Sequence, residues 1–552
     1  MRRSGQIYVF LAVCMAVMML SCSPVEAPSE NDGPVVETPA DPEPEKPSDE
    51  DPEPDPTPDL PAFESSYDAI RSMGVGWNLG NTLDAVWWTG GTDGRDWRAW
   101  ETGWGQPVTE PELMTMMKKA GFGAIRVPVT WGVHMDTDGK VFDQWMDRVN
   151  EIVDYVLNAG MYCIINVHHD TGADPDAWLV AEPVIYENVK ARYEGLWRQI
   201  AERFKPYDQR LLFESYNEML DESRSWCYAS MNLGYDAAVA AQAYDAVNSY
   251  AQSFVDVVRA TGGNNAVRNL VVNTYGACNG SGTWNPHLPD PLIYMKMPSD
   301  KVKDHILFQV HAYPLIDELP VMEAEVSEMF SLLDRHLVSK GGPVIIGEWG
   351  TFSENPSLEN FCHYADYFVR KAKQYGMATF HWMNLSDGFY RSLPAFSHPE
   401  LTESIVKAYH GEGFIPEIPV LDNFDLDFKV TYRQIWSEAN LNSSTLDLSL
   451  YKAIRFELDK APVNGNLSVK VYGESDGKEQ YASFSDASAT VYFDRNALGS
   501  KARRVTLQYM KEGTYETIIR HVALIKNDGT ETESMPSVFW GCEMEMIVVS
   551  QD

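Results

Sequence analysis

Basic residues are few in this chain of 552 residues: 44 Lys and Arg stand against 80 Asp and Glu, and the formal net charge is −36. Such a surface repels phosphate backbones, so we exclude nucleic acid as a partner. Cysteine is also rare, and seven residues without a repeated spacing predict neither a disulfide framework nor a zinc motif. No glycine-rich phosphate loop interrupts the predicted strands, which removes the main nucleotide-binding class, and we expect no cofactor.

The N-terminal residues 1–22 have the pattern of an export signal. Arg2 and Arg3 precede an apolar stretch that is too short to span a membrane comfortably, and the stretch ends at Ser21 and Cys22. This segment resembles a bacterial lipoprotein signal with Cys22 as the lipidated residue, and an ordinary secretory signal cut nearby is the alternative. We therefore expect a lipid-anchored protein of the cell envelope, at the outer membrane, on its outer or its periplasmic side.

Residues 23–62 are mostly proline and acid, with Lys46 as their only basic residue. A segment of this composition cannot bury a hydrophobic core, and its charges repel one another. It is predicted to be an extended tether between the anchor and the folded part of the chain.

Short β-rich runs alternate with helical stretches between residues 63 and 415. Several runs are continuously apolar, as expected for parallel strands that are buried on both faces. The predicted strands are residues 75–80, 124–129, 162–168, 211–217, 269–275, 305–313, 343–349 and 378–384. One helix is predicted over residues 109–121, with Thr109 as its N-cap and Gly121 as its end. Eight strands separated by helices predict an α/β fold, a (β/α)8 TIM barrel.

Residues 421–552 have a different pattern, because apolar and polar residues alternate with period two and Asn527-Asp528-Gly529 has a hairpin-turn composition. This pattern predicts an all-β sandwich, jelly-roll-like. Exposed Trp436 or Trp540 would suit a carbohydrate-binding domain, and a purely structural sandwich remains equally open.

Reactive side chains in a TIM barrel gather at the carboxyl ends of the strands. The predicted strand ends carry Arg126, His168, Asn217, Glu218, His311, Tyr313, Glu348 and Trp382. Glu218 and Glu348 close the fourth and seventh predicted strands and would face each other across one mouth. Hydrolysis of a glycosidic bond requires such a pair, with one carboxyl protonated and the other ionised, and a separation of about 5–5.5 Å predicts retention of configuration.

Several motifs resemble glycoside hydrolase family 5, and most closely its endo-β-1,4-glucanase branch, subfamily 4. They are GWNLGNTLDA (76–85), ETGWGQPVT (101–109), IRVPVTW (125–131), NVHHD (166–170), FESYNE (213–218), VHAY (310–313), IGEWG (346–350) and HWMN (381–384). The resemblance covers roughly residues 63–410. It differs at Met219, where many members of the family have proline.

The resemblance implies a role for each of these residues. Glu218 would be the general acid/base and Glu348 the nucleophile, while Asn217 would bind the 2-hydroxyl of the sugar. Arg126 and Tyr313 would keep Glu348 ionised. Four further residues, His168, His311, Asn78 and His169, would line or support the cleavage subsite, and Trp382 would form its floor.

Two patterns have alternative readings. His168-His169-Asp170 could suggest a metal site, but adjacent strand residues point to opposite faces, so we expect no metal. The tryptophans Trp87, Trp88, Trp97, Trp100 and Trp104 follow the first strand and could stack on glucose rings or pack the loop on the barrel, and Trp131, Trp226 and Trp284 are equally ambiguous.

The predicted activity is endo-cleavage of β-1,4-glucosidic bonds by a monomer, in cellulose, mixed-linkage β-glucan or xyloglucan. Two alternatives stay open: the same chemistry on mannan or xylan, and a surface lipoprotein that binds glycans without cleaving them.

Overall fold

The computed structural model describes residues 62–86, 93–174, 176–353, 356–382, 389–391, 395–396, 398–420, 424–463 and 465–551. The predicted signal with Cys22, almost all of the tether, and the two residues Trp87 and Trp88 lie outside these ranges. Within them, no helix combines the length and apolar character that crossing a membrane requires.

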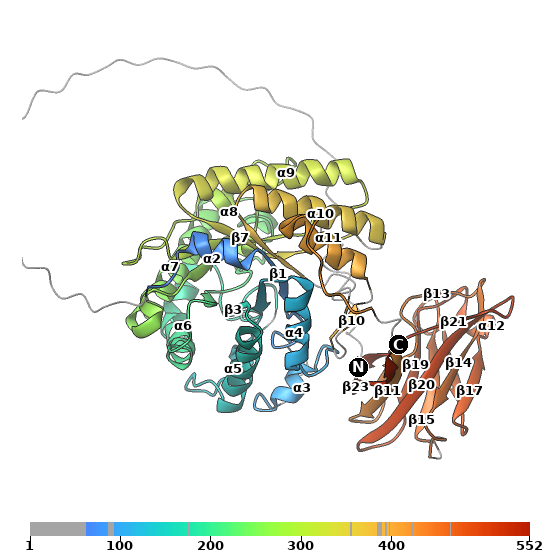
Figure 1. Cartoon of the computed structure of the whole chain (residues 1–552). Coiled ribbons are helices and arrows are strands. Elements are labelled where there is room, and N and C mark those ends of the chain that lie inside the picture. Colours follow the sequence, from blue (N-terminus) through green and yellow to red (C-terminus); the bar gives the residue numbers. More distant parts are fainter. Residues whose placement is uncertain are drawn as a thin grey trace, which may run out of the picture. The chain divides into compact units, whose positions relative to one another are not determined.

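Eight parallel strands close into a barrel in chain order, which confirms the predicted fold class (Figure 1). The strands are β1 (Val75–Asn78), β2 (Ala124–Val127), β3 (Tyr162–Asn166), β4 (Leu211–Glu214), β5 (Leu270–Asn273), β6 (Ile306–Ala312), β7 (Val344–Trp349) and β8 (Ala378–His381). Apart from Tyr162, all of their residues are buried, because helices cover the outside of the sheet and side chains fill its interior.

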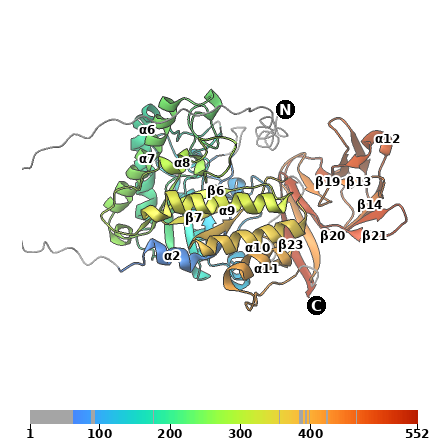
Figure 2. The ribbon, with the colours of Figure 1, turned by 90° about the horizontal axis from the view of Figure 1, so that it is seen from above.

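Helices surround the barrel, and Figure 2 shows α9, α10 and α11 side by side on its outside. The helices of this part are α2 (Ser66–Met73), α3 (Trp97–Glu101), α4 (Pro111–Ala120), α5 (Asp143–Asn158), α6 (Pro183–Arg203), α7 (Ala237–Ala260), α8 (Asp290–Ile293), α9 (Leu319–His336), α10 (Leu358–Gln374) and α11 (Pro399–His410). Helix α10 buries Phe361, Tyr364, Ala365 and Phe368, at the spacing of one amphipathic face.

The start of α4 differs from the sequence prediction. Glu110 is its N-cap residue and Pro111 its first helical residue, a position that suits proline because the missing N–H would have no helical partner there. Thr109 instead donates its backbone N–H to the Glu101 carboxylate at 2.7 Å, so it belongs to the preceding loop. The end of the helix is as predicted, with Gly121 in the left-handed conformation.

The C-terminal part consists of antiparallel sheets, as predicted for an all-β domain. One sheet has the order β17-β14-β20-β11-β23, with β21 beside β20, and the other has the order β16-β15-β19-β12-β22. Their strands are β11 (Phe424–Tyr432), β12 (Glu438–Asn440), β14 (Tyr451–Leu458), β15 (Leu467–Tyr472), β16 (Glu479–Ser483), β17 (Ser488–Tyr492), β19 (Arg504–Tyr509), β20 (Tyr515–Lys526), β21 (Glu531–Glu533), β22 (Ser537–Trp540) and β23 (Cys542–Gln551).

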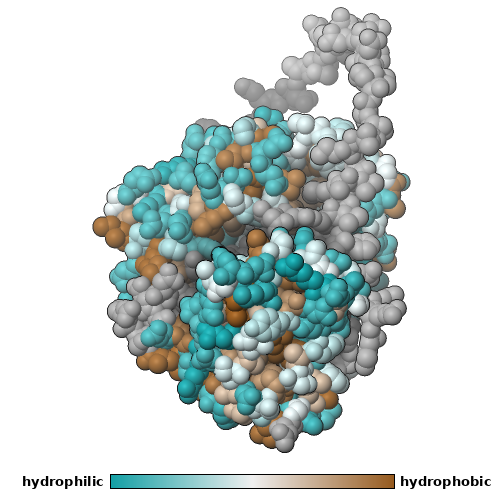
Figure 3. Space-filling model, turned by 90° about the vertical axis from the view of Figure 1, so that its right-hand side faces the viewer, coloured by the Kyte–Doolittle hydropathy of each residue, from teal (hydrophilic) through white to brown (hydrophobic). Residues whose placement is uncertain are grey.

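The two sheets share one hydrophobic core, to which β14 contributes Ile454 and Phe456, and β15 and β19 contribute Val469 and Val505. The predicted hairpin turn joins β20 to β21, with Gly529 at a φ of 94°. On the face that Figure 3 shows, hydrophilic residues predominate and hydrophobic ones form small separate groups.

Candidate active site

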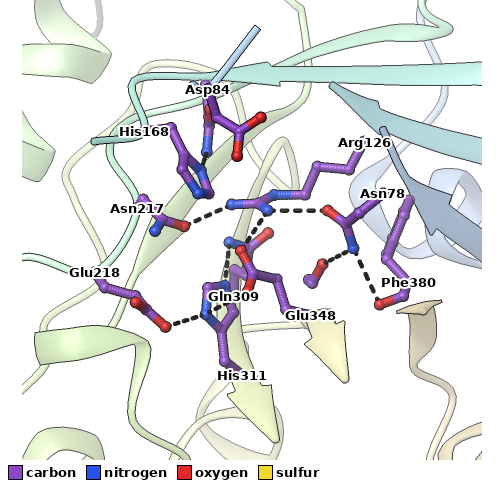
Figure 4. A network of polar contacts seen from close by, with 12 residues as sticks. Asn78, Asp84, Arg126, His168, Asn217, Glu218, Gln309, His311, Glu348 and Phe380 are labelled. Carbon is purple, nitrogen blue, oxygen red and sulfur yellow. Dashed lines mark hydrogen bonds and ion pairs between the residues drawn. The ribbon is translucent and has the colours of Figure 1, made fainter. Parts of the chain in front are cut away.

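Arg126 is the centre of a buried polar network at one end of the barrel (Figure 4). Its guanidinium donates to both oxygens of Glu214, at 2.7 and 2.8 Å, and to Glu348 Oε1 at 2.8 Å. It also donates to Asn217 Oδ1 at 2.8 Å and to Asn78 Oδ1 at 3.0 Å. One cation therefore holds side chains from β1, β4, β7 and the segment after β4 in fixed positions.

Glu214 belongs to this network, and the sequence analysis missed it. It closes β4, whereas Glu218 lies four residues beyond the strand, so the predicted extent of this strand was wrong. Burial by itself would raise the pKa of Glu214, but the charge and hydrogen bonds of Arg126, with a hydrogen bond from Asn166, lower it overall. An acid inside the apolar run LLFES was the available signal, because an unpaired carboxylate there would be very costly.

The backbone around Glu348 is irregular in a way that aims its side chain. Strand β7 has one extra residue relative to β6, because Val310 pairs with Ile346 while the next residue, His311, pairs with Glu348. The extra residue is Gly347, and such a bulge redirects the side chain that follows it. A Cβ at Gly347 would lie 2.1 Å from the Gln309 side chain, so any larger residue would displace Gln309.

Two donors bind the Glu348 carboxylate. The Arg126 guanidinium donates to Oε1, and the Tyr313 hydroxyl donates to Oε2 at 2.7 Å. Burial raises the pKa of Glu348, and the charge of Glu218 adds to this effect, while His311, Arg126 and Tyr313 act in the opposite direction. The expectation that Arg126 and Tyr313 favour the ionised form thus agrees with the direction of their effects, although burial outweighs them.

Glu218 lies on the opposite side of the site from Arg126. His311 Nδ1 is 2.7 Å from Glu218 Oε1 and 3.5 Å from Glu348 Oε2, so this ring lies between the two acids. Gln309 Nε2 is 3.3 Å from His311 Nε2, and when it donates there, His311 keeps its proton on Nδ1 and donates it to Glu218. His311 and Tyr313 both reach the site, as their i, i+2 spacing predicts.

The separation of the two acids is short. Carboxylate oxygens of Glu218 and Glu348 and a ring nitrogen of His311 all lie within 4.8 Å of one another. The Glu218 side chain is 24% exposed against 6% for Glu348, so Glu218 is the more accessible of the pair. This spacing suits direct attack on a sugar by one acid and is too short for an intervening water.

His168 and His169 do not point to opposite faces of a strand, which corrects the argument used against a metal. Strand β3 ends at Asn166, and beyond it both rings lie with Asp84 in one cluster whose possible ligand atoms are within 4.8 Å. These groups nonetheless have protein partners. His169 Nδ1 is 2.9 Å from Asp174 Oδ2, and Asp84 accepts the backbone N–H groups of Asn81 and Thr82.

The same contacts set the charges of the two histidines. Burial lowers the pKa of His168, and the charges of His169 and Arg126 lower it further, so His168 is neutral. Burial would also lower the pKa of His169, but the hydrogen bond and charge of Asp174, with the charge of Asp84, raise it overall.

Trp382 directly follows β8 and packs over Gly80, two residues after the end of β1. A Cβ at Gly80 would lie 2.6 Å from the Trp382 ring, and the ring is parallel to that of His168, at a centroid distance of 5.8 Å. Among the described residues, Asn217 uses its Oδ1 and its backbone groups, and no partner accepts from its Nδ2. Trp382 and Asn217 therefore leave an aromatic face and an amide donor for a ligand.

Most of the described tryptophans after β1 pack the loop. Trp97 lies against the Arg148 guanidinium at 4.7 Å, and Trp100 is buried and bonded to the Asp93 carbonyl. Trp104 contacts the His169 ring edge-on at 5.4 Å. Elsewhere, Trp131 is fully buried, whereas Trp284 is 55% exposed.

Met219 is fully buried in the barrel core next to Glu218. Its carbonyl accepts the backbone N–H of Gly276 at 3.0 Å, which ties the segment that carries Glu218 to the loop after β5. Packing and this hydrogen bond hold the segment in place without a proline at this position.

A family model described as Cellulase (glycosyl hydrolase family 5) matches residues 88–388. Endoglucanase A from Clostridium longisporum is 33% identical over 336 residues, which cover 58% of this chain and 60% of that protein. Endoglucanase B from Neocallimastix patriciarum is 32% identical over 368 residues, covering 62% of this chain and 72% of that protein. The match thus spans less than two thirds of the length of the first of these relatives.

Solved structures are also similar. A GH5-4 broad specificity endoglucanase from an uncultured bacterium has a TM-score of 0.61 and 53% identity, covering 64% of this chain and 98% of its own. A glycoside hydrolase family 5 enzyme from Prevotella bryantii B14, in complex with a xyloglucan tetradecasaccharide, has a TM-score of 0.57 and 40% identity, covering 63% of this chain and 99% of its own.

Proposed function

The chain belongs to glycosyl hydrolase family 5, and from this premise we propose that it is an endo-acting β-1,4-glucanase that works by retaining double displacement. The observation that carries the mechanism is the pair of carboxylates with oxygens within 4.8 Å, of which only one is bonded to Arg126. Two acids at this distance can act on the same glycosidic bond without a metal or an organic cofactor.

Glu348 is the nucleophile. Its two oxygens accept from Arg126 and Tyr313, and both contacts stabilise the ionised carboxylate that attacks the anomeric carbon. The bulge at Gly347 and the buried network of Arg126 hold this group before substrate arrives. Attack forms a glycosyl-enzyme ester while the bond to the leaving sugar breaks.

Glu218 is the acid/base. Within the described part of the chain no Lys or Arg bonds to it, whereas Arg126 bonds to Glu348, and its contact with His311 leaves one oxygen available to the leaving group. It donates a proton to the departing glycosidic oxygen and then takes a proton from the water that hydrolyses the ester. Asn217 binds the sugar 2-hydroxyl through its free amide donor, and Trp382 stacks on the sugar face.

The substrate we propose is a β-1,4-linked glucan: cellulose, mixed-linkage β-glucan or xyloglucan. The supporting facts are that similar solved structures include one with a bound xyloglucan oligosaccharide, one with bound cellotriose, and a lichenase with cellotetraose. Phe352 is 45% exposed and stacks on Tyr313 at 5.0 Å, so it offers a further aromatic face beside the site, which suits a polymer rather than a single sugar.

The test compares reducing ends released from barley β-glucan, xyloglucan, carboxymethyl cellulose, glucomannan and xylan. We expect release from the three glucans by the wild type and none by Glu348→Ala. Glu222→Ala, an exposed acid in the same segment as Glu218, is the matched control and should keep full activity. A wild type that binds glucan but releases no sugar refutes the proposal in favour of a binding protein, and release only from mannan or xylan refutes the choice of substrate.

Azide separates the two roles. With an aryl cellobioside, whose leaving group needs little protonation, Glu218→Ala should still form the glycosyl-enzyme, and azide should speed its breakdown and give a β-glycosyl azide. Azide acting on Glu348→Ala should give the α-product, because it attacks from the vacant nucleophile side. The opposite pair of products would reverse the two roles.

We also propose that the chain is a lipoprotein of the bacterial outer membrane, anchored through Cys22. The support is the sequence pattern of residues 1–22 and the acidic, proline-rich segment that follows. Radiolabelled fatty acid should be incorporated into the wild type and not into Cys22→Ala. Equal incorporation into both would contradict the anchor.

A further inference from the structure

The sheet β16-β15-β19-β12-β22 turns one face to the sandwich core and a second face away from it. Leu467, Val469 and Val471 of β15 lie in the core, so the alternate residues Lys470 and Tyr472 lie on the second face. The ladder registers place three further residues there: Tyr481 opposite Lys470, Arg504 opposite Tyr472, and Glu438 opposite Gln508. The contact of the Arg504 guanidinium with the Phe539 ring adds Phe539 to this face. We call these six residues the second face.

Aromatic rings are exposed on the second face. Tyr481 is 57% exposed and Phe539 is 37% exposed, and Tyr472 lies edge-on to Phe539 at a centroid distance of 6.4 Å. Exposed apolar side chains that are grouped on one face mark contact sites, and the flat faces of these rings match the apolar faces of pyranose rings.

Hydrogen bonds to the buried Glu438 carboxylate hold the polar groups between these rings in place. The Glu438 carboxylate is 3% exposed and accepts the Tyr472 hydroxyl at 2.7 Å and the Gln508 amide at 2.6 Å. A buried polar network of this kind fixes the orientation of Tyr472. The rings are therefore presented in a set geometry, as a preformed binding site requires.

Arg504 is the residue on this face whose guanidinium offers N–H groups to a ligand. Its guanidinium lies 3.3 Å from the centre of the Phe539 ring, and within the described part of the chain no carboxylate or carbonyl accepts a hydrogen bond from it. Burial lowers the pKa of Arg504, and the nearby charges of Tyr472 and Glu438 oppose this effect only in part. Ring hydroxyls of a sugar would accept the unused N–H groups of this planar fork.

The charges of the second face and its margin cancel. Lys470 lies 3.5 Å from Glu479, and Arg504 stands near the buried Glu438, so two cations are balanced by two acids. A face without net charge selects neither nucleic acid nor an acidic glycan. Exposed aromatic rings interleaved with hydroxyl-binding groups fit a neutral polysaccharide instead.

We propose that the second face is a glycan-binding site for a neutral β-linked polysaccharide, separate from the catalytic cleft. That this polysaccharide is the same polymer that the barrel cleaves rests on the proposed function. The existence of the site does not depend on it. Holding the polymer at a second point raises its local concentration at the cleft, so the site increases cleavage of long chains and leaves cleavage of short ones unchanged.

The experiment uses the full chain with Glu348→Ala, which cannot degrade the ligand, in affinity electrophoresis through gels that contain barley β-glucan or xyloglucan. Tyr481→Ala, Phe539→Ala and Arg504→Ala are compared with Tyr492→Ala. Tyr492 is a 67% exposed tyrosine on β17 of the other sheet and serves as the matched control. Thermal unfolding of each variant verifies that the sandwich is intact.

We expect the second-face variants to bind at least one of the two polysaccharides about tenfold more weakly each, and Tyr492→Ala to bind like its parent. In the active protein, the same variants should release fewer reducing ends from the polymer and cleave an aryl cellobioside at the parental rate. If the second-face variants are retarded as strongly as Tyr492→Ala, the proposed site is overturned. It is also overturned if these variants lose self-association in light scattering but still bind the polysaccharide. A wild type that is retarded but hydrolyses no glucan would instead refute the proposed function and leave the site standing.

Discussion

Removal of a single hydroxyl from Tyr313 should shift the acid limit of activity. The Tyr313 hydroxyl donates to Glu348 Oε2 at 2.7 Å, and Phe at this position keeps the ring that stacks on Phe352 at 5.0 Å. Glu348 must be ionised to attack, so activity falls below its pKa, which burial already raises. The hydroxyl stabilises the ionised form, and Tyr313→Phe therefore raises this pKa further.

The size of the shift follows from the burial of the acceptor. A hydrogen bond to a charged group contributes about 1.5–3 kcal/mol, and roughly 1.4 kcal/mol corresponds to one pKa unit. The Glu348 side chain is only 6% exposed, so water can replace little of the lost contact. The acid limb of kcat/KM should move to higher pH by about 1–2 units, and below it the rate should fall about tenfold per pH unit.

The assay is the pH profile of kcat/KM on an aryl cellobioside. Tyr155→Phe is the matched control, since its hydroxyl donates to the Glu151 carboxylate at 2.8 Å on the surface of α5, and its profile should coincide with the wild type. An acid limb that stays in place while the plateau falls would refute the reasoning, because Tyr313 would then only position the nucleophile.

Three further changes test other parts of the site. Glu214→Gln leaves the buried Arg126 without its two-oxygen partner and should lower the free energy of unfolding in denaturant by about 3–5 kcal/mol. The control Glu151→Gln changes a half-exposed partner of Arg148 and should lower it by less than about 1 kcal/mol, and equal losses would contradict the role of burial. Gly347→Ala brings a Cβ to 2.1 Å from Gln309 and should lower kcat/KM at least about tenfold. The control Gly413→Ala has nothing within 4 Å of its Cβ and should change neither activity nor stability. Full activity of Gly347→Ala would show that the bulge is dispensable. Dialysis against a chelator should leave activity unchanged, because His169 and Asp84 have protein partners, and a loss restored by one divalent cation would identify the cluster as a metal site.

The strand order and the end of the barrel that carries the site could be predicted because both depend on residue patterns within short segments of the sequence. Continuous apolar runs separated by amphipathic stretches indicate buried parallel strands, and polar residues just beyond them must lie at one end of a barrel. Glu348 and His311 followed from this rule. Glu218 did as well, although β4 ends earlier, at Glu214, than the apolar run suggested.

Local patterns were insufficient where a partner lies far away in the chain. Arg126 and Glu214 are 88 positions apart, and Arg126 and Glu348 are 222 apart, so nothing near Glu214 reveals its cation. The error over His168 and His169 has the same origin, because the chain leaves strand geometry after Asn166 and the rule of alternating faces no longer applies.

The sequence by itself determined the class of fold, the all-β character of the C-terminal part and the pair of acids, since hydrophobic periodicity and residue chemistry are properties of short segments. The tertiary structure alone decided which acid is paired with Arg126, that Gly347 forms a bulge against Gln309, and that Tyr472, Arg504 and Phe539 share one face. These facts depend on strand register and on contacts between distant segments, which form only when the whole chain packs around its cores.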